Sequence, residues 1–196
     1  MEIKLATLEE LDGIFALLRA NHVSGLSEEE QADGFVTTAL TDAQMTRLIA
    51  QEHGVTVAQE RGRVLAFAMA APWSFWAEWP LFAYMIEKLP AFKLAGQTLT
   101  TQNSYQYGPI CVDRRVRGSG LFEQVFACSL DSMRARYPLM ATFINQRNPR
   151  SYAAHTRKVH MTQAGTFQYD DKNYYLMACS TSLVRPATLG VPGETV

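Results

Sequence analysis

The residues best suited to chemistry lie between positions 110 and 121, where a predicted strand ends, arginines and glycines follow, and a predicted helix begins. Gly118 and Gly120 have no Cβ, so the backbone there can adopt positive φ and come close to a ligand. The N–H groups of the first helical turn then converge and, with the helix dipole, favour an anion. Arg115 and Arg117 add charge at the rim. This pattern predicts an anion site; a glycine-rich connection with surface arginines is the alternative.

Two common phosphate-binding motifs do not describe this turn. A Walker A loop requires GxxxxGK[ST], and the sequence contains no such run. The dinucleotide fingerprint requires a third glycine, but the residue three positions after Gly120 is Glu123. The predicted anion site is therefore of a different kind from either of these motifs.

A second stretch with chemical potential covers residues 148–161. Asn148 is predicted to cap a helix that has Pro149 at its first position, which is a favoured place for proline. His155 follows within that helix and could transfer a proton. A histidine on an amphipathic helix is otherwise a surface or core-edge residue, and this interpretation stays open.

Both stretches resemble the GCN5-related N-acetyltransferase (GNAT) superfamily. Residues 115–120 match its Q/R-x-x-G-x-G/A signature, and residues 148–161 occupy the place of its N-x-x-A-x-x-x-Y-x-x-x-G-F pattern. His155 stands at the usual Tyr position. His160 and Met161 replace Gly-Phe, so His160 is expected to adopt a left-handed conformation. The order of predicted elements from residue 2 to 180 is also that of the superfamily, so the resemblance covers nearly the whole chain.

The resemblance implies an α/β (α+β) fold with a GNAT-like mixed, mostly antiparallel sheet of about seven strands, flanked by helices and splayed between strands 4 and 5. It implies acetyl-CoA as cosubstrate and no metal. The pantetheine arm would run between the splayed strands, and the glycine turn would hold the pyrophosphate. The residues implied to bind the cofactor are Ile110, Cys111, Val112, Arg115, Arg117, Gly118, Ser119, Gly120, Leu121, Phe122, Asn148, Ser151 and Arg157.

Acetyl transfer from a thioester to an amine needs a neutral amine, a donor for the developing oxyanion, a proton for the leaving thiolate, and contact between the reactants. The resemblance assigns the proton to His155. Glu78 is the predicted catalytic carboxylate, although Tyr105 and Tyr107 are also candidates for the base. Cys111 is more typical of a small buried hydrophobe than of a nucleophile, because no partner base is apparent.

The acceptor side is predicted from an aromatic insert at residues 73–82. These rings could form an apolar wall for a small amine, with Glu78 pairing its positive charge. Trp76, Tyr105 and Tyr107 are the predicted substrate-binding residues. The alternative is that the insert packs its aromatic rings into the core or into a homodimer interface.

Composition limits the class of protein. The chain has 196 residues with 47% hydrophobic and 19% charged side chains, which excludes a disordered or repetitive protein. We expect one domain over residues 1–185 and a loosely ordered tail over 186–196. The three cysteines fit no disulfide or zinc pattern, and no signal peptide is visible, so we expect a cytoplasmic location. Pro72 and Pro80 interrupt the apolar segment 64–86, which argues against a membrane span.

Charge is divided unevenly along the chain. Residues 1–60 contain eleven acidic and three basic side chains, whereas residues 105–160 contain nine basic and three acidic ones. A basic half suits a polyanionic ligand, and chance arrangement of solvated faces is the alternative. Because the formal net charge is −1, a nucleic-acid-binding function is disfavoured.

Two functions remain. The first is an acetyl-CoA-dependent N-acyltransferase that moves an acetyl group to a primary amine of a small molecule or amino-acid-like acceptor, by direct attack in a ternary complex. The second is a non-catalytic CoA- or acyl-CoA-binding regulatory or sensor module on the same fold, for which the replacement of the usual Tyr by His155 leaves room.

The elements that must position these residues follow from hydrophobic periodicity and turn signals. Capping-box patterns predict helix starts at residues 7–10, 27–30 and 41–44. Strands are predicted at 2–6, 55–58, 64–70, 105–112, 139–145, 166–169 and 174–180, and further helices at 81–89, 121–136 and from 149.

Overall fold

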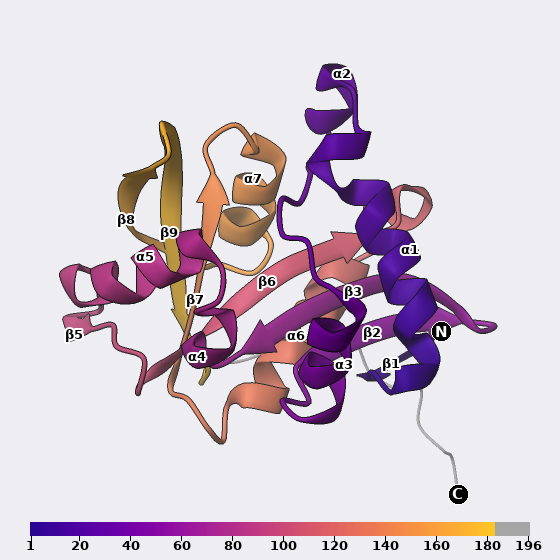
Figure 1. Ribbon diagram of the computed structural model, residues 1–196, viewed down its shortest axis with the longest axis horizontal. Helices are drawn as coiled ribbons and strands as arrows, with labels where there is room; N and C mark the ends of the chain where they lie inside the picture. The colour runs from indigo at the N-terminus through magenta and orange to yellow at the C-terminus, as the bar shows by residue number, and fades with distance from the viewer. Residues whose placement is uncertain (183–196) are drawn as a thin grey trace, which may run out of the picture.

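A computed structural model describes residues 1–182 of the chain (Figure 1). The predicted domain boundary at residue 185 and the predicted loose tail over residues 186–196 lie outside the described residues. None of the helices within residues 1–182 combines the length and the apolar character that crossing a bilayer requires.

A seven-stranded sheet forms the centre of the structure, in the order β1-β2-β3-β6-β7-β9-β8. Neighbouring strands are antiparallel except for β6 and β7, which run parallel. The predicted mixed, mostly antiparallel sheet is therefore confirmed. Its strands are β1 (Glu2–Leu5), β2 (Val55–Glu60), β3 (Arg63–Ala71), β6 (Ser104–Val112), β7 (Leu139–Asn145), β8 (Thr162–Tyr169) and β9 (Lys172–Ser180).

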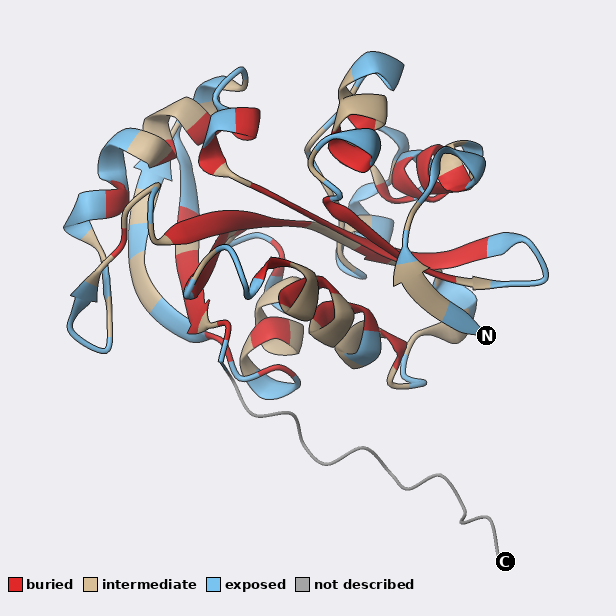
Figure 2. Cartoon of the chain, turned by 90° about the horizontal axis from the view of Figure 1, so that it is seen from below, coloured by how far each residue is buried: buried red, intermediate tan, exposed pale blue. Residues whose placement is uncertain are grey.

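Helices cover both faces of this sheet, and the buried residues lie along it (Figure 2). One core forms between the sheet and the helices α1, α3, α4 and α5, and a second forms between the sheet, α6 and the segment around α7. The α-helices are α1 (Leu11–Asn21), α2 (Glu28–Gln31), α3 (Asp42–Ala50), α4 (Trp73–Trp76), α5 (Pro80–Lys88), α6 (Leu121–Met133) and α7 (Pro149–Arg157). Short 3-10 turns occupy Leu8–Glu10, Val23–Gly25, Leu89–Ala91 and Arg114–Val116.

Local signals in the sequence place the helix starts correctly. All three predicted capping boxes, at residues 7–10, 27–30 and 41–44, are present with both reciprocal hydrogen bonds. Asn148 caps α7 through its side chain, and Pro149 is the first residue of that helix, as predicted. Part of the acidic N-terminal half is therefore structural, because Glu10 and Glu30 complete two of these boxes.

The sheet opens between β6 and β7. Their pairing runs from Ser104 opposite Leu139 to Gln106 opposite Ala141 and then stops. Just beyond, two residues of β6, Gly108 and Pro109, lie opposite the single residue Met69 of β3, which is a β-bulge, and a cis peptide bond joins the two. The predicted splay between the fourth and fifth major strands is confirmed. Among residues 1–182, the end of β6 therefore has no neighbouring strand on the β7 side.

The insert between β3 and β6 differs from the prediction. Besides the predicted helix, now α5, it contains the short helix α4 and a two-stranded ladder of β4 (Lys93–Leu94) and β5 (Gln97–Thr98). The last hairpin also starts earlier than predicted, at Thr162, because β8 continues through an irregularity at Gly165. Glycine within a strand weakens the β signal. The ring of Phe92 lies where a Cβ of Gly165 would be.

The turn after α3 depends on a close backbone approach. His53, not Gly54, takes the left-handed conformation there, with φ 50°. A Cβ on Gly54 would lie 2.1 Å from the carbonyl oxygen of Ala70, whose N–H donates to the Gly54 carbonyl. Glycine is needed at position 54 because no side-chain atom fits there.

We expect Gly54→Ala to destabilise the protein by at least about 2 kcal/mol, because the methyl group must push α3 away from β3. Gly25→Ala is the matched control, since its added Cβ would come no closer than 3.9 Å to the Arg19 carbonyl oxygen. Urea unfolding of both variants measures the difference. Equal stabilities would show that the turn adjusts freely.

Candidate active site

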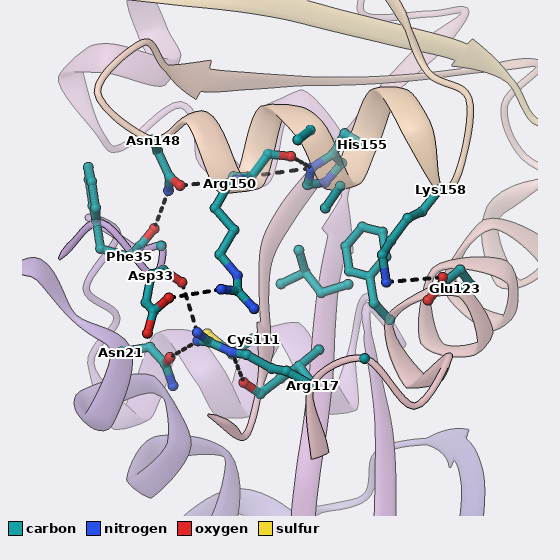
Figure 3. Close-up of a pocket in the computed structure, with 18 of the residues that line it drawn as sticks. Asn21, Asp33, Phe35, Cys111, Arg117, Glu123, Asn148, Arg150, His155 and Lys158 are labelled. Atoms are coloured by element: carbon teal, nitrogen blue, oxygen red, sulfur yellow. Dashed lines mark hydrogen bonds and ion pairs between the residues drawn. The ribbon is translucent and has the colours of Figure 1, made fainter. Parts of the chain in front are cut away.

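A cavity of about 400 Å³ follows the opening between β6 and β7 (Figure 3). Its walls are the end of β6, the N-terminus of α6, one face of α7, and the segment 33–36 that follows α2. The cavity therefore joins the two stretches that the sequence singles out, residues 110–121 and 148–161, with a third segment that carries no recognised motif.

The glycine turn has the geometry of an anion site. Gly118 and Gly120 have φ of 85° and 83°, and Gly120 is the N-cap of α6. No side chain caps this helix, so its first N–H groups have no acceptor from the cap residue. A Cβ on Gly118 would meet open space, so packing does not require glycine there. Both glycines line the cavity, and so does Phe122.

The sequence predicts that Arg117 adds charge at the rim of the anion site, but the structure holds its guanidinium in hydrogen bonds within the protein. Its guanidinium donates to the carbonyl oxygens of Val112 (3.1 Å) and Asp33 (2.8 Å) and to Oδ1 of Asn21 (3.0 Å). Partial burial and the neighbouring Arg150 lower the pKa of this guanidinium. Arg117 thus ties the end of β6 to α1 and to the segment after α2.

Three further residues of the glycine turn keep their side chains out of the cavity lining. Arg115 pairs with Asp113, and the Ser119 hydroxyl donates to the Val116 carbonyl oxygen at 2.7 Å. Leu121 is buried in the core beneath α6. These residues can contribute main-chain groups only.

The segment after α2 was missed by sequence reasoning. Asn148 donates from Nδ2 to the Phe35 carbonyl oxygen at 2.9 Å, and Arg150 contacts Oδ1 of Asp33 at 2.8 Å (Figure 3). Val36 also lines the cavity. The uneven charge distribution was the available signal, because Asp33 belongs to the acidic half and Arg150 to the basic half. Much of that asymmetry is intramolecular pairing and not a field for a ligand.

The far end of the cavity lies between α6 and the end of α7. Lys158 and Glu123 form an ion pair there at 3.2 Å (Figure 3). Arg157 also lines the cavity, as do the predicted residues Ile110, Cys111, Val112 and Ser151. Burial raises the pKa of the Cys111 thiol, which agrees with the interpretation of this residue as a hydrophobe.

His155 is buried between the glycine turn and β6. Its Nδ1 lies 2.7 Å from the carbonyl oxygen of Ser151, so Nδ1 carries the proton and Nε2 is left as an acceptor. Burial lowers the pKa of His155 to about 4, despite the Ser151 hydrogen bond. The ring is therefore neutral at pH 7, and in this tautomer Nε2 cannot donate a proton to a thiolate. This geometry does not favour the predicted role of proton donor.

This buried ring makes stability depend on pH. The unfolded chain binds a proton at His155 below pH 6.5, whereas the folded chain resists it until about pH 4. The contribution of the neutral His155 ring to the unfolding free energy is fully present above pH 6.5. It is lost as the pH falls to about 4, and the total loss is about 3 kcal/mol. We expect His155→Gln to lose this component, so its unfolding free energy should decline less than that of the original protein between pH 7.5 and 4. Parallel declines in urea titrations would contradict the assignment.

Three predicted residues are not brought to the site. Glu78 lies outside the cavity with its carboxylate held by Arg47 (2.8 Å) and Gln44 (3.1 Å), and these contacts lower its pKa. Trp76 is fully buried and stacks on Phe82 at 5.0 Å. Tyr105 is fully buried in the core beneath α6.

The aromatic insert was predicted either to line the acceptor site or to pack into the core or a homodimer interface. Trp76 packs into the core. The structure gives no geometric support for Glu78 as a base or for Trp76 and Tyr105 as substrate ligands.

Tyr107 does reach a cavity. A second, smaller cavity of about 100 Å³ lies at the bottom of the opening, beside the Gly108–Pro109 bulge. Ile110, Asn148, Ser151 and His155 line both cavities, so the two adjoin. The larger cavity along the end of β6 and the smaller one beside the bulge thus form one connected groove.

Comparison with known proteins supports this description at the level of fold. No family model matches the chain, and no curated protein sequence matches it. Solved structures do match. An N-acetyltransferase from Staphylococcus aureus Mu50 has a TM-score of 0.59 at 19% identity, covering 92% of this chain and 98% of that one.

Two further solved structures agree. An acetyltransferase of the GNAT family from Streptococcus agalactiae 2603 has a TM-score of 0.62 at 13% identity, covering 90% and 93% of the two chains. The ribosomal-protein-S18-alanine N-acetyltransferase from Escherichia coli has a TM-score of 0.58 at 11% identity, covering 94% and 96%. The chain therefore has the GNAT fold, and the predicted resemblance is confirmed at that level.

Proposed function

We propose that the protein is an acetyl-CoA-dependent N-acyltransferase, which moves an acetyl group to a primary amine of a small molecule or amino-acid-like acceptor by direct attack in a ternary complex. One observation carries the proposal. The sheet opens after Gln106 directly beside a helix whose N-terminus is preceded by two glycines of positive φ. An extended ligand with a phosphate at one end fits both features together.

Successive segments of the groove match successive parts of acetyl-CoA, from the pantetheine arm to the adenosine phosphate. Main-chain groups at alternate residues of the Ile110–Val112 segment face the side of β6 that β7 leaves open, and they would bond to the pantetheine arm like an added strand. The open space at Gly118 and the N–H groups of α6 would hold the pyrophosphate. Arg157 and Lys158, at the far end, would face the adenosine phosphate.

The chain's own contribution to the reaction is placement and polarisation. One main-chain N–H of residues 110–112 would donate to the thioester carbonyl oxygen, where negative charge develops. Asn148 and Ser151 line both cavities and would hold the two reactants in contact. His155, neutral and protonated on Nδ1, would act as a hydrogen-bond acceptor near the reacting centre. The thiolate would then take its proton from the amine or from solvent.

A CoA- or acyl-CoA-binding sensor module is the second candidate. The neutral state of His155 and the position of Glu78 outside the cavity favour it, since neither supplies acid-base chemistry at the site. Thiol release from acetyl-CoA in the presence of an amine panel distinguishes the two. Release above the amine-free background supports the enzyme, and binding without release supports the sensor.

The cofactor site is tested by Gly118→Asp against Gly118→Asn. Both residues tolerate positive φ and have the same shape, so they differ in charge alone. We expect the aspartate variant to bind acetyl-CoA at least about tenfold more weakly than the asparagine variant in calorimetry, because its carboxylate would face the pyrophosphate. Affinities within about threefold of each other would mean that no phosphate lies against residue 118, and the assignment would fail.

A further inference from the structure

The smaller cavity has a lining without formal charge. Within residues 1–182 no Asp, Glu, Lys or Arg side chain borders it. Its walls combine aromatic rings with hydroxyl and amide groups, among them Phe82, Phe143, Thr38, Thr142 and Gln106.

The three titratable groups in the lining of this cavity are also neutral at pH 7. Burial raises the pKa of Tyr107 and Tyr174 and lowers that of His155. In the adjoining groove, Arg150 and Asp33 form an ion pair at 2.8 Å, and Arg117 donates to neutral oxygen atoms. An acceptor held in the smaller cavity therefore meets no charged side chain among the described residues of its lining.

We infer that this cavity selects acceptors whose only ionisable group is the reacting amine, attached to a compact aromatic or apolar body. This inference rests on the proposed acetyltransferase function and names its substrate class. This narrows the proposed acceptors to small-molecule amines, because diamines, polyamines and free amino acids each carry a second charge that the cavity cannot pair.

The physical basis is the cost of burying an unpaired charge. A second ammonium or a carboxylate would leave water without finding a counter-ion, which is strongly unfavourable. The reacting amine does not carry a charge into the cavity, because it enters without its proton. Burial away from carboxylates lowers the pKa of an amine and so favours this neutral form. A chamber that favours the neutral amine also supplies the nucleophile without a carboxylate base, which is consistent with the place of Glu78 outside it.

Size points to the same class. A cavity of about 100 Å³ is comparable with the engineered cavity of roughly 150 Å³ that admits benzene. Phe82 and Phe143 meet edge to face at 4.9 Å, and Phe143 meets Tyr174 at 5.8 Å, so the wall consists of rings that can pack against another ring. The hydroxyl and amide groups of the lining leave room for one neutral polar substituent.

Two matched pairs of acceptors test the inference with the full chain and saturating acetyl-CoA. Benzylamine is compared with 4-(aminomethyl)benzylamine, which adds a second amine, and phenethylamine with phenylalanine, which adds a carboxylate. We expect kcat/KM from thiol release to be at least about tenfold higher for the first member of each pair. A smaller ratio in either pair, or no turnover of benzylamine and phenethylamine, would overturn the inference.

A charge placed in the cavity gives a second test. Thr38→Asp adds a carboxylate to the lining, and Thr38→Asn is its neutral match in shape. Relative to the asparagine variant, the aspartate variant should raise the ratio of kcat/KM for the diamine over benzylamine by at least about fivefold. An unchanged ratio, in variants with equal thermal midpoints, would place the acceptor elsewhere and overturn the inference.

Failure of this inference and failure of the proposed function are separable. If acetyl-CoA binding responds to the charge at residue 118 but charged amines react as well as neutral ones, only the acceptor class is wrong. If the Asp and Asn variants of Gly118 bind acetyl-CoA equally, the cofactor site itself is wrong.

Discussion

The parting of β6 and β7 is the constraint on which the rest of the structure depends. Where two parallel strands separate after three paired residues, the main-chain N–H and C=O groups on their facing edges lose their strand partners and must be satisfied by other groups. The Val112 carbonyl oxygen, for example, accepts a hydrogen bond from Arg117 at 3.1 Å. The bulge at Gly108–Pro109 turns β6 away, while Arg117 anchors its end to α1 and to the segment after α2. Both features act on β6 and fix its end away from β7.

The uneven charge of the sequence has a structural explanation. Acidic residues of the first sixty positions complete capping boxes or pair with arginines of the later half, as in Glu30 with Arg114 and Glu52 with Arg136. The end of α6 has no side-chain cap, so part of the positive character beside the cavity comes from backbone dipoles. Under the proposed function, the main chain of the glycine turn would contribute to phosphate binding together with Arg157 and Lys158.

The sequence predicts best what short-range chemistry determines. The three capping boxes, the glycines of positive φ and the Asn148 cap are local patterns, and the structure contains all of them. Glu78 and Trp76 were misplaced because their partners, Arg47 and Phe82, are set by packing that no spacing reveals. The segment 33–36 carries no periodic or motif signal, so its place over the groove emerges only from the folded chain.

The ring contacts that link Trp76 through Phe82 and Phe143 to Tyr174 have a consequence for how the molecule could diversify. These contacts fix the side chains on one side of the smaller cavity before anything binds there. A bound molecule would therefore pay little conformational entropy for ordering that wall. This wall comes from α5, β7 and β9, whereas the glycine turn lies between β6 and α6. Under the proposed function, substitutions in the insert would therefore change the choice of acceptor without altering the residues that would bind acetyl-CoA.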